Sequence, residues 1–388
     1  MRSEKQPSDI TSDISDIKDT EDIENKDAPT RRLPLFSKIA FLAAGACALL
    51  FLGFIISERF ADFFNENISS VFRAILAKIT DVLPFSLAEM VLILSPVIVF
   101  FLVRYAMKNF ADSWRDTLIF CGAIVSVIAI FFCSFTLTFA AAYRGTRLDE
   151  KLGIERREVS AEELYETALI LAERVNEEAE AVVFERGGSS VMPYGYREMN
   201  DKLIEAYDKA CIKYDFIQSL DSDLKPVMLS GLMSYTHITG VDSFFTGEAN
   251  INVAFPDYTI PYTAAHELAH QRGIAREDEA NFMAFLVCTE SEDAYIRYSA
   301  YLNLYEYVAN ALYTASPELY KEVYSQLTGY AKGEMIAYAQ FYERYRDSVA
   351  SEVSDAVNNT FLTIQGTEGT KSYGMVVDLA VAYYIPAE

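Results

Sequence analysis

The clearest chemical pattern in the chain is the sequence His-Glu-x-x-His at residues 266–270. On a helix, His266 and His270 lie on one face, one turn apart, where both imidazoles can bind a single metal ion. Glu267 lies beside them and can act as the general base on a zinc-activated water. The chain has only three histidines, and two of them belong to this pattern. The spacing therefore predicts one zinc ion per chain, with Glu267 as the catalytic residue.

A catalytic zinc site needs a third protein ligand, and no third histidine lies near the motif. Gly273 can end the motif helix in a left-handed turn, so that the next helix starts near Arg276. Among the acidic residues of that helix, Glu277 shares a face with small residues, which would let the two helices approach closely. We therefore favour Glu277 as the third ligand, with Glu279 as the alternative. Asn281 is a candidate for orienting a ligand histidine by a hydrogen bond.

The developing oxyanion of a hydrolytic reaction also needs a stabiliser, usually His, Tyr or Arg. The candidates are His237, Tyr258, Tyr262 and Tyr373. A lone histidine is more often structural, and the chain has 25 tyrosines. The sequence leaves this choice open.

The elements that must position these residues fall into two parts, because apolar residues are concentrated in the first 142 positions. Three long apolar runs occupy 39–56, 82–103 and 118–142, and the second is interrupted only by Glu89. Each run is long enough to cross a hydrocarbon core of about 30 Å. We expect a disordered acidic tail over 1–32, a membrane domain over 33–142 with three transmembrane helices, and a soluble domain over 143–388.

Between the first two runs, apolar residues recur at helical spacing, which predicts an amphipathic helix over 60–81. It would lie on the membrane surface or against the bundle. The soluble part is mainly helical in its periodicity. The run Ala249–Phe255 alternates and indicates a short strand or hairpin. The fold class expected is α+β, mainly helical with a small sheet; the stretch 372–384 could be helix or strand.

Basic residues give an orientation for the membrane part. Six flank the first run or lie in the second loop, against three in the first loop. The positive-inside rule then places the N-terminus in the cytoplasm and the soluble domain outside it, in a multi-pass membrane protein. In that compartment Cys211 and Cys288 could form a disulfide or remain buried single thiols. The net charge of −23 argues against nucleic acid as a partner.

The sequence HELAHQRGIAREDEANF resembles the DUF3810 family of bacterial membrane proteins, which is grouped with the zincin-like peptidases. The resemblance includes the three apolar runs, FFTGEANIN and SYGMVVDLAVAYY, and so covers most of the chain. It implies a zincin-like metallopeptidase domain. The segment REDEAN also resembles the ExxxD segment of gluzincins, where the first Glu binds zinc. Glu277 takes that place here, and Asn281 stands where those enzymes have Asp.

In zincins, an edge strand before the motif helix binds substrate as an added strand. The resemblance therefore makes Asn250, Asn252 and Ala254 candidates for a substrate strand, although an ordinary hairpin is almost equally expected. Together these features predict a membrane-anchored zinc metallopeptidase acting on a protein or peptide substrate. The alternative is a zinc-stabilised binding or sensor domain with little turnover. A transporter or channel has little support, since Glu89 is the single acidic residue within the spans.

Overall fold

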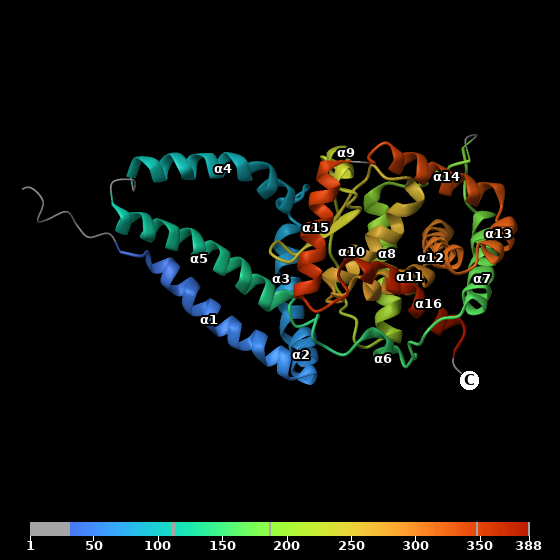
Figure 1. Ribbon diagram of the computed structural model, residues 1–388, viewed down its shortest axis with the longest axis horizontal. Coiled ribbons are helices and arrows are strands. Elements are labelled where there is room, and N and C mark those ends of the chain that lie inside the picture. Colours follow the sequence, from blue (N-terminus) through green and yellow to red (C-terminus); the bar gives the residue numbers. More distant parts are fainter. Residues whose placement is uncertain (1–31, 110–112, 186–187, 347, 387–388) are drawn as a thin grey trace, which may run out of the picture.

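The computed structural model describes residues 32–109, 113–185, 188–346 and 348–386, and it is mainly helical (Figure 1). The tail expected to be disordered lies, apart from residue 32, outside the described residues. One small sheet of three strands lies among the helices. The mainly helical α+β class expected from the sequence is confirmed at this level.

Three helices are long and apolar enough to cross a membrane: α1 (Leu35–Ile56), α4 (Leu87–Asn109) and α5 (Trp114–Thr138). In Figure 1 they extend together from one end of the molecule, and α1 packs along α5. Such helices are compatible with a membrane protein. The second helix begins at Leu87 rather than at residue 82, because the preceding residues form a turn. The third ends at Thr138 rather than at 142, where the chain turns toward the other helices.

The amphipathic helix expected over 60–81 is instead three pieces. These are α2 (Glu58–Phe64), a π-helical turn η1 (Asn65–Ser69) and α3 (Ser70–Thr80). The buried guanidinium of Arg73 donates to both the side-chain and the backbone oxygen of Asn65, at 2.8 and 3.1 Å. These bonds are made at the π-helical turn η1, and the apolar spacing in the sequence does not indicate such a turn.

The remaining helices build the larger part of the molecule. They are α6 (Leu148–Leu152), α7 (Ala161–Ala179), α8 (Tyr196–Lys213), α9 (Ser230–Met233), η2 (Ser234–Thr236), η3 (Asp257–Thr259), α10 (Ile260–Gln271), α11 (Glu277–Thr289), α12 (Ala294–Ala315), α13 (Pro317–Gln326), α14 (Gly329–Glu343), α15 (Val349–Ile364), η4 (Gly369–Met375) and α16 (Val376–Tyr384). The stretch 372–384, open between helix and strand from the sequence, is helical.

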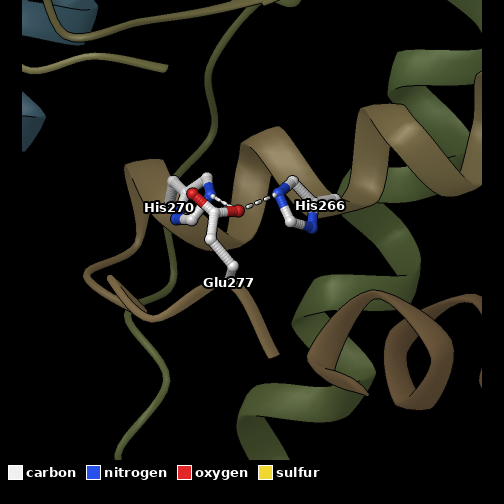
Figure 2. A group of neighbouring side chains, drawn as sticks. All are labelled: His266, His270 and Glu277. Carbon is white, nitrogen blue, oxygen red and sulfur yellow. Dashed lines mark ion pairs between the residues drawn. The ribbon is translucent and has the colours of Figure 1, made fainter. Parts of the chain in front are cut away.

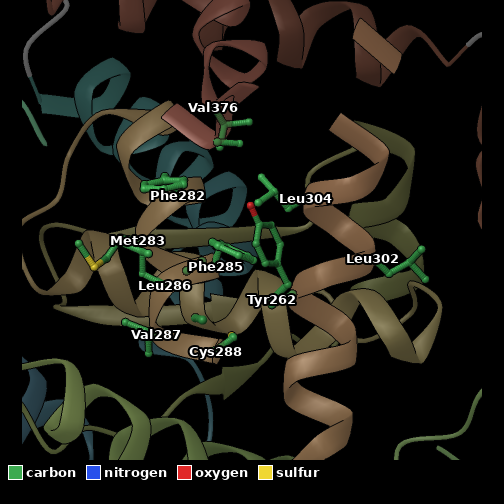
Figure 3. Close-up of a cluster of buried hydrophobic side chains, with 14 of the residues drawn as sticks. Tyr262, Phe282, Met283, Phe285, Leu286, Val287, Cys288, Leu302, Leu304 and Val376 are labelled. Carbon is green, nitrogen blue, oxygen red and sulfur yellow. The ribbon is translucent and has the colours of Figure 1, made fainter. Parts of the chain in front are cut away.

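The main core forms where α11 packs against α10 and α12. Figure 3 shows Phe282 and Phe285 of α11 near Leu304 of α12 and Tyr262 of α10. Every residue of α11 from Glu277 to Cys288 is buried, so this helix is surrounded by protein on all sides. It follows that its polar residues must find partners inside the protein.

The sheet consists of β1 (Lys225–Pro226), β2 (Gly240–Ser243) and β3 (Glu248–Ile251). Strand β3 lies in the middle, parallel to β1 and antiparallel to β2. The hairpin expected from the sequence is therefore present, but its strand β3 ends at Ile251 and has a neighbour on each side.

A second buried cluster joins the apolar helices to the rest of the molecule. It contains Phe54, Phe64, Phe135, Phe139, Tyr143 and, from the loop between α10 and α11, Ala275. All five cysteines are described and free, so Cys211 and Cys288 form no disulfide here. The loop that separates the motif helix from the next helix thus packs where the three apolar helices join the rest of the molecule.

Candidate metal centre

The position of the site follows from the way α10 ends. Gly273 has φ of 90° in the left-handed region, where glycine avoids the strain of a side chain. Its N–H donates to the carbonyl of His270 at 2.9 Å, and that of Ile274 donates to Ala269 at 3.1 Å. This pair of bonds is a Schellman motif. The left-handed end predicted at Gly273 is confirmed, and α11 begins four residues later at Glu277.

The turn brings Glu277 against both histidines of the motif (Figure 2). Its Oε2 lies 3.2 Å from Nε2 of His266 and 3.4 Å from Nε2 of His270. Ligands of tetrahedral zinc, at bonds of about 2.0–2.1 Å, are about 3.3 Å apart. The spacing of the one carboxylate and the two imidazoles therefore fits a zinc ion held by these three residues. Within the described part of the chain, these three residues are the one group identified as able to hold a metal.

Hydrogen bonding orients one of the two imidazoles. Nδ1 of His270 lies 2.8 Å from the carbonyl oxygen of Ile274, which leaves Nε2 facing Glu277. Metal-binding histidines usually have such a bond at the second nitrogen. Asn281 lies beside His266, yet within the described residues Nδ1 of His266 has no short hydrogen bond.

Charges in this closed site strongly influence one another. Burial alone would raise the pKa of Glu277, but the charge of His270 and the contacts with both imidazoles hold it well below its ordinary value. Burial alone would lower the pKa of His270, but Glu277, Glu267 and Asp242 raise it to about 10. Burial and the neighbouring His270 lower the pKa of His266. Without a metal, protonated His270 and ionised Glu277 thus form an ion pair. A divalent cation that binds both side chains would take the place of the proton on His270, so metal binding would release a proton.

Glu267 takes no part in this cluster. It is only 4% exposed, and its carboxyl lies directly against Gly240 of β2 and accepts a hydrogen bond from the backbone of Asp242. Burial, with the negative charges of Glu277 and Asp242, raises the pKa of Glu267 to about 8, although His270 opposes this. A carboxyl with a raised pKa beside a candidate metal centre is suited to proton transfer.

Glu279, the alternative third ligand, is held elsewhere. Its Oε1 accepts from the backbone N–H of Leu148 and from Nη1 of Arg276, both at 3.2 Å. Burial raises the pKa of Glu279, while Arg276 lowers it. Of the two candidate carboxylates, the structure brings only Glu277 to the histidines.

The oxyanion candidates named from the sequence are engaged with other partners. His237 has φ of 58°, and its two ring nitrogens lie 3.0 Å from the carbonyl of Tyr345 and 2.8 Å from the hydroxyl of Tyr342. The hydroxyl of Tyr258 donates to Glu306 at 3.1 Å. Tyr262 lies nearer the site and donates to the backbone oxygen of Asn281 at 2.8 Å. The side chain of Tyr373 lies outside the described residues.

Two other tyrosines lie close enough to Glu277 for its charge to act on them. Burial raises the pKa of Tyr143 well above its ordinary value, and Glu277 adds to this. Burial, again with Glu277, raises the pKa of Tyr307 to about 12, and Tyr307 also interacts with Asn281. Both hydroxyls are therefore protonated donors at neutral pH. Sequence reasoning missed them because nothing local distinguishes them among 25 tyrosines.

The expected substrate strand needs a correction. Asn250 lies in the central strand β3, and Asn252 and Ala254 follow its end. Asn250 and Asn252 are buried and their side-chain amides bond within the loop and hairpin. The expectation of an edge strand here is wrong, because β2 covers that side of β3. The outer strand beside the motif helix is β2 itself.

Comparison with known protein families identifies the family of the chain. The family model "Protein of unknown function (DUF3810)" matches residues 64–381, which is more than half of the chain and contains His266, His270 and Glu277. No curated protein and no solved structure matches the chain.

Proposed function

Because the chain belongs to the DUF3810 family, which is described only as having unknown function, we propose its activity from the site itself. The proposal is a membrane-anchored zinc metallopeptidase that hydrolyses peptide bonds of a protein or peptide substrate. One observation carries it: Glu277 meets both histidines of the HExxH motif, while Glu267 of the same motif stays free of that cluster. A purely structural site would not need this additional buried carboxyl.

In this proposal, His266, His270 and Glu277 hold the zinc ion. The ion would act as a Lewis acid that polarises the scissile carbonyl and lowers the pKa of water at the site. Glu267 accepts a proton from the attacking water and returns it to the leaving amine. Tyr143 and Tyr307 are the candidates for donating a hydrogen bond to the developing oxyanion, because both hydroxyls are buried and protonated near Glu277.

The outer edge of β2 is the candidate place for the substrate backbone. The bond from Asn252 N–H to the carbonyl of Thr239 fixes the hairpin register. In an antiparallel pair, alternate residues direct their backbone groups to the partner. Thr239 and Val241 therefore bond toward β3, and the backbone groups of Gly240 and Asp242 face away from it. On that side the backbone N–H of Asp242 already bonds Glu267, which leaves the groups of Gly240 and the carbonyl of Asp242 for a substrate. A peptide added to this edge would pass directly over the general base.

We also propose that the catalytic part lies outside the cytoplasm. The end of α1, the start of α4 and the end of α5 all lie on the side of the catalytic helices (Figure 1). The basic residues counted from the sequence favour a cytoplasmic position for the opposite ends.

The activity is tested by Glu267→Gln, which keeps the shape and removes the basic carboxylate. Zinc content should stay near one ion per chain, while proteolysis falls by about 10²-fold or more. Glu277→Gln should instead lose zinc, because a ligand is removed. Glu279→Gln is the matched control: it alters a buried carboxyl two residues away that contacts neither histidine. It should retain both zinc and activity.

Substrates can be found by comparing membrane and secreted proteins from cells that carry wild type or Glu267→Gln. If wild-type protein binds zinc but cleaves nothing in broad peptide libraries, and no protein accumulates in cells carrying Glu267→Gln, the peptidase proposal fails. A zinc-stabilised sensor or binding domain is then the better reading. If the wild-type protein binds no zinc, the peptidase proposal and the zinc-stabilised sensor or binding domain are both wrong.

A further inference from the structure

Helix α15 carries a row of exposed apolar side chains. Val349, Val353, Val357 and Ile364 are 75, 58, 65 and 67% exposed. Their spacing of four, four and seven residues, one or two helical turns, places them on one face of the helix, and the exposed acidic Asp355 lies on another. Because charged residues lie on the other side, this is an amphipathic helix, and no described residue of the chain covers its apolar face.

The apolar row belongs to a helix that lies where the apolar helices join the rest of the molecule (Figure 1). Phe361, at the border of the row, places its ring 6.0 Å from that of Phe135 in the last turn of α5. It also lies 6.2 Å from the ring of Tyr143, just after α5. Figure 1 shows α15 running across the ends of α4 and α5, roughly perpendicular to α4. If these helices cross a bilayer, α15 lies along its surface.

The hairpin between β2 and β3 shows how closely the rest of the protein approaches the apolar part of α5. The ring of Phe245 lies 5.1 Å from that of Phe131, which is two turns, about 10 Å, before the end of α5. The hydroxyls of Ser134 and Thr138 donate to the carbonyl of Phe244, at 3.3 and 3.1 Å. The hairpin tip is thus fixed beside the apolar helix itself. The catalytic part therefore rests against the membrane end and does not stand away from it.

Helix α3 has a similar position and character. It belongs to the segment that joins the end of α1 to the start of α4. Its residues Phe72, Ile75 and Ile79 are exposed by 39, 51 and 63%, whereas Arg73 on its other side is buried. Two amphipathic helices from distant parts of the sequence thus lie where the apolar helices join the rest of the molecule (Figure 1), and they continue the apolar surface of α4 and α5.

We propose that α15 is an in-plane membrane helix, whose face of Val349, Val353, Val357 and Ile364 is covered by the bilayer that α1, α4 and α5 cross. Lipid is the occupant because the face continues the apolar surface of the spans at their ends. The inference depends on the three helices crossing a membrane, and it does not depend on the proposed peptidase activity.

The test uses tryptophan fluorescence of the full chain in lipid nanodiscs. Trp114 is the only tryptophan, so Trp114→Phe provides a background without this fluorophore. In it, Val353→Trp reports on the apolar face, and Asp355→Trp is the matched control on another face of the same helix. Nanodiscs with lipids brominated on the acyl chains near the headgroup quench tryptophan in the bilayer, and iodide quenches tryptophan in water.

Tryptophan at position 353 should lose most of its emission in brominated nanodiscs and little with iodide. Tryptophan at position 355 should behave in the opposite way. If iodide quenches both positions equally, the apolar face lies in water and the proposal is wrong. If position 353 is protected from both quenchers, protein and not lipid covers the face, which also overturns it. Val357→Trp repeats the measurement should Val353→Trp not fold.

Discussion

At the scale of single residues, the position of Glu267 depends on Gly240. A Cβ atom built at Gly240 would collide with the carboxyl of Glu267, whereas the glycine allows β2 to lie directly on the motif helix. Backbone approach of this kind is one reason for glycine in a strand. The carboxyl of Glu267, the general base of the proposed reaction, thus occupies space that Gly240 leaves open, and it is oriented by the backbone of Asp242.

Gly240→Ala should therefore displace Glu267 without removing a zinc ligand. We expect proteolysis to fall by about 10²-fold, the scale of a displacement of about 1 Å at a catalytic group. Zinc content, measured by atomic absorption, should remain near one per chain. Gly231→Ala is the control, since an added Cβ there meets nothing within 4 Å. Equal activity of the two variants would show that Glu267 tolerates displacement or takes no part in the reaction.

At the scale of elements, the turn between α10 and α11 connects the candidate metal ligands to the apolar helices. Asn65 donates to the carbonyl of Gly273 at 3.1 Å, and the buried Arg73 donates to the carbonyl of Arg272 at 3.4 Å. Arg73 also donates to the carbonyl of Thr138, at the end of α5, at 2.8 Å. One guanidinium therefore connects the end of an apolar helix to the end of the motif helix. Burial lowers the pKa of Arg73 to about 10, so it remains charged at neutral pH.

Gly273→Ala tests this connection. The left-handed φ should cost about 1 kcal/mol for a residue with a side chain. In addition, the new Cβ would lie 2.5 Å from Nη2 of Arg73 and 2.8 Å from Oδ1 of Asn65. The control is Gly153→Ala, where φ is 67° but an added Cβ meets nothing within 4 Å. We expect both variants to unfold at a lower temperature, and Gly273→Ala alone to bind zinc more weakly. If both variants bind zinc with equal affinity, the conformation of this turn does not affect zinc binding, and the prediction is wrong.

At the scale of the whole molecule, side chains of the apolar helices and side chains of the rest of the protein each bond the backbone of the other part. Glu248 of β3 accepts from the backbone N–H groups of Leu87 and Ala88 at 2.9 Å, and so caps the start of α4. The carboxylate of Glu89, in the first turn of α4, accepts hydrogen bonds from the backbone N–H groups of Met228 and Leu229, at 3.0 and 2.9 Å. The acidic residue that stood alone within the second apolar run thus has a structural role at the base of the helix.

The proposed orientation can be checked on intact cells. In a variant without native cysteines, Ser160→Cys should react with a membrane-impermeant maleimide, because the domain that contains it lies outside. Lys108→Cys, at the opposite end of α4, should react only after the cells are permeabilised. The reverse pattern would place the catalytic part in the cytoplasm. It would leave the zinc chemistry and the position of α15 on the bilayer unchanged.

The sequence alone determined the features that depend on local spacing. Two histidines four residues apart share a face of any helix, so the pairing of His266 and His270 needed no tertiary information. The left-handed end at Gly273 and the three long apolar helices follow equally from local chemistry. Near-neighbour geometry is enough for these predictions, because a helix repeats the same way wherever it is packed.

Only the tertiary structure decided which distant groups meet. Whether Glu277 or Glu279 faces the histidines depends on how α11 packs after the turn, and Tyr143, Arg73 and Gly240 reach the site from other elements. The position of β3 in the middle of the sheet was likewise hidden, because a strand of four residues gives the same alternation at an edge or in the centre. Such contacts join residues far apart in the chain, and their partners are chosen by packing and burial. A local sequence pattern does not contain that choice.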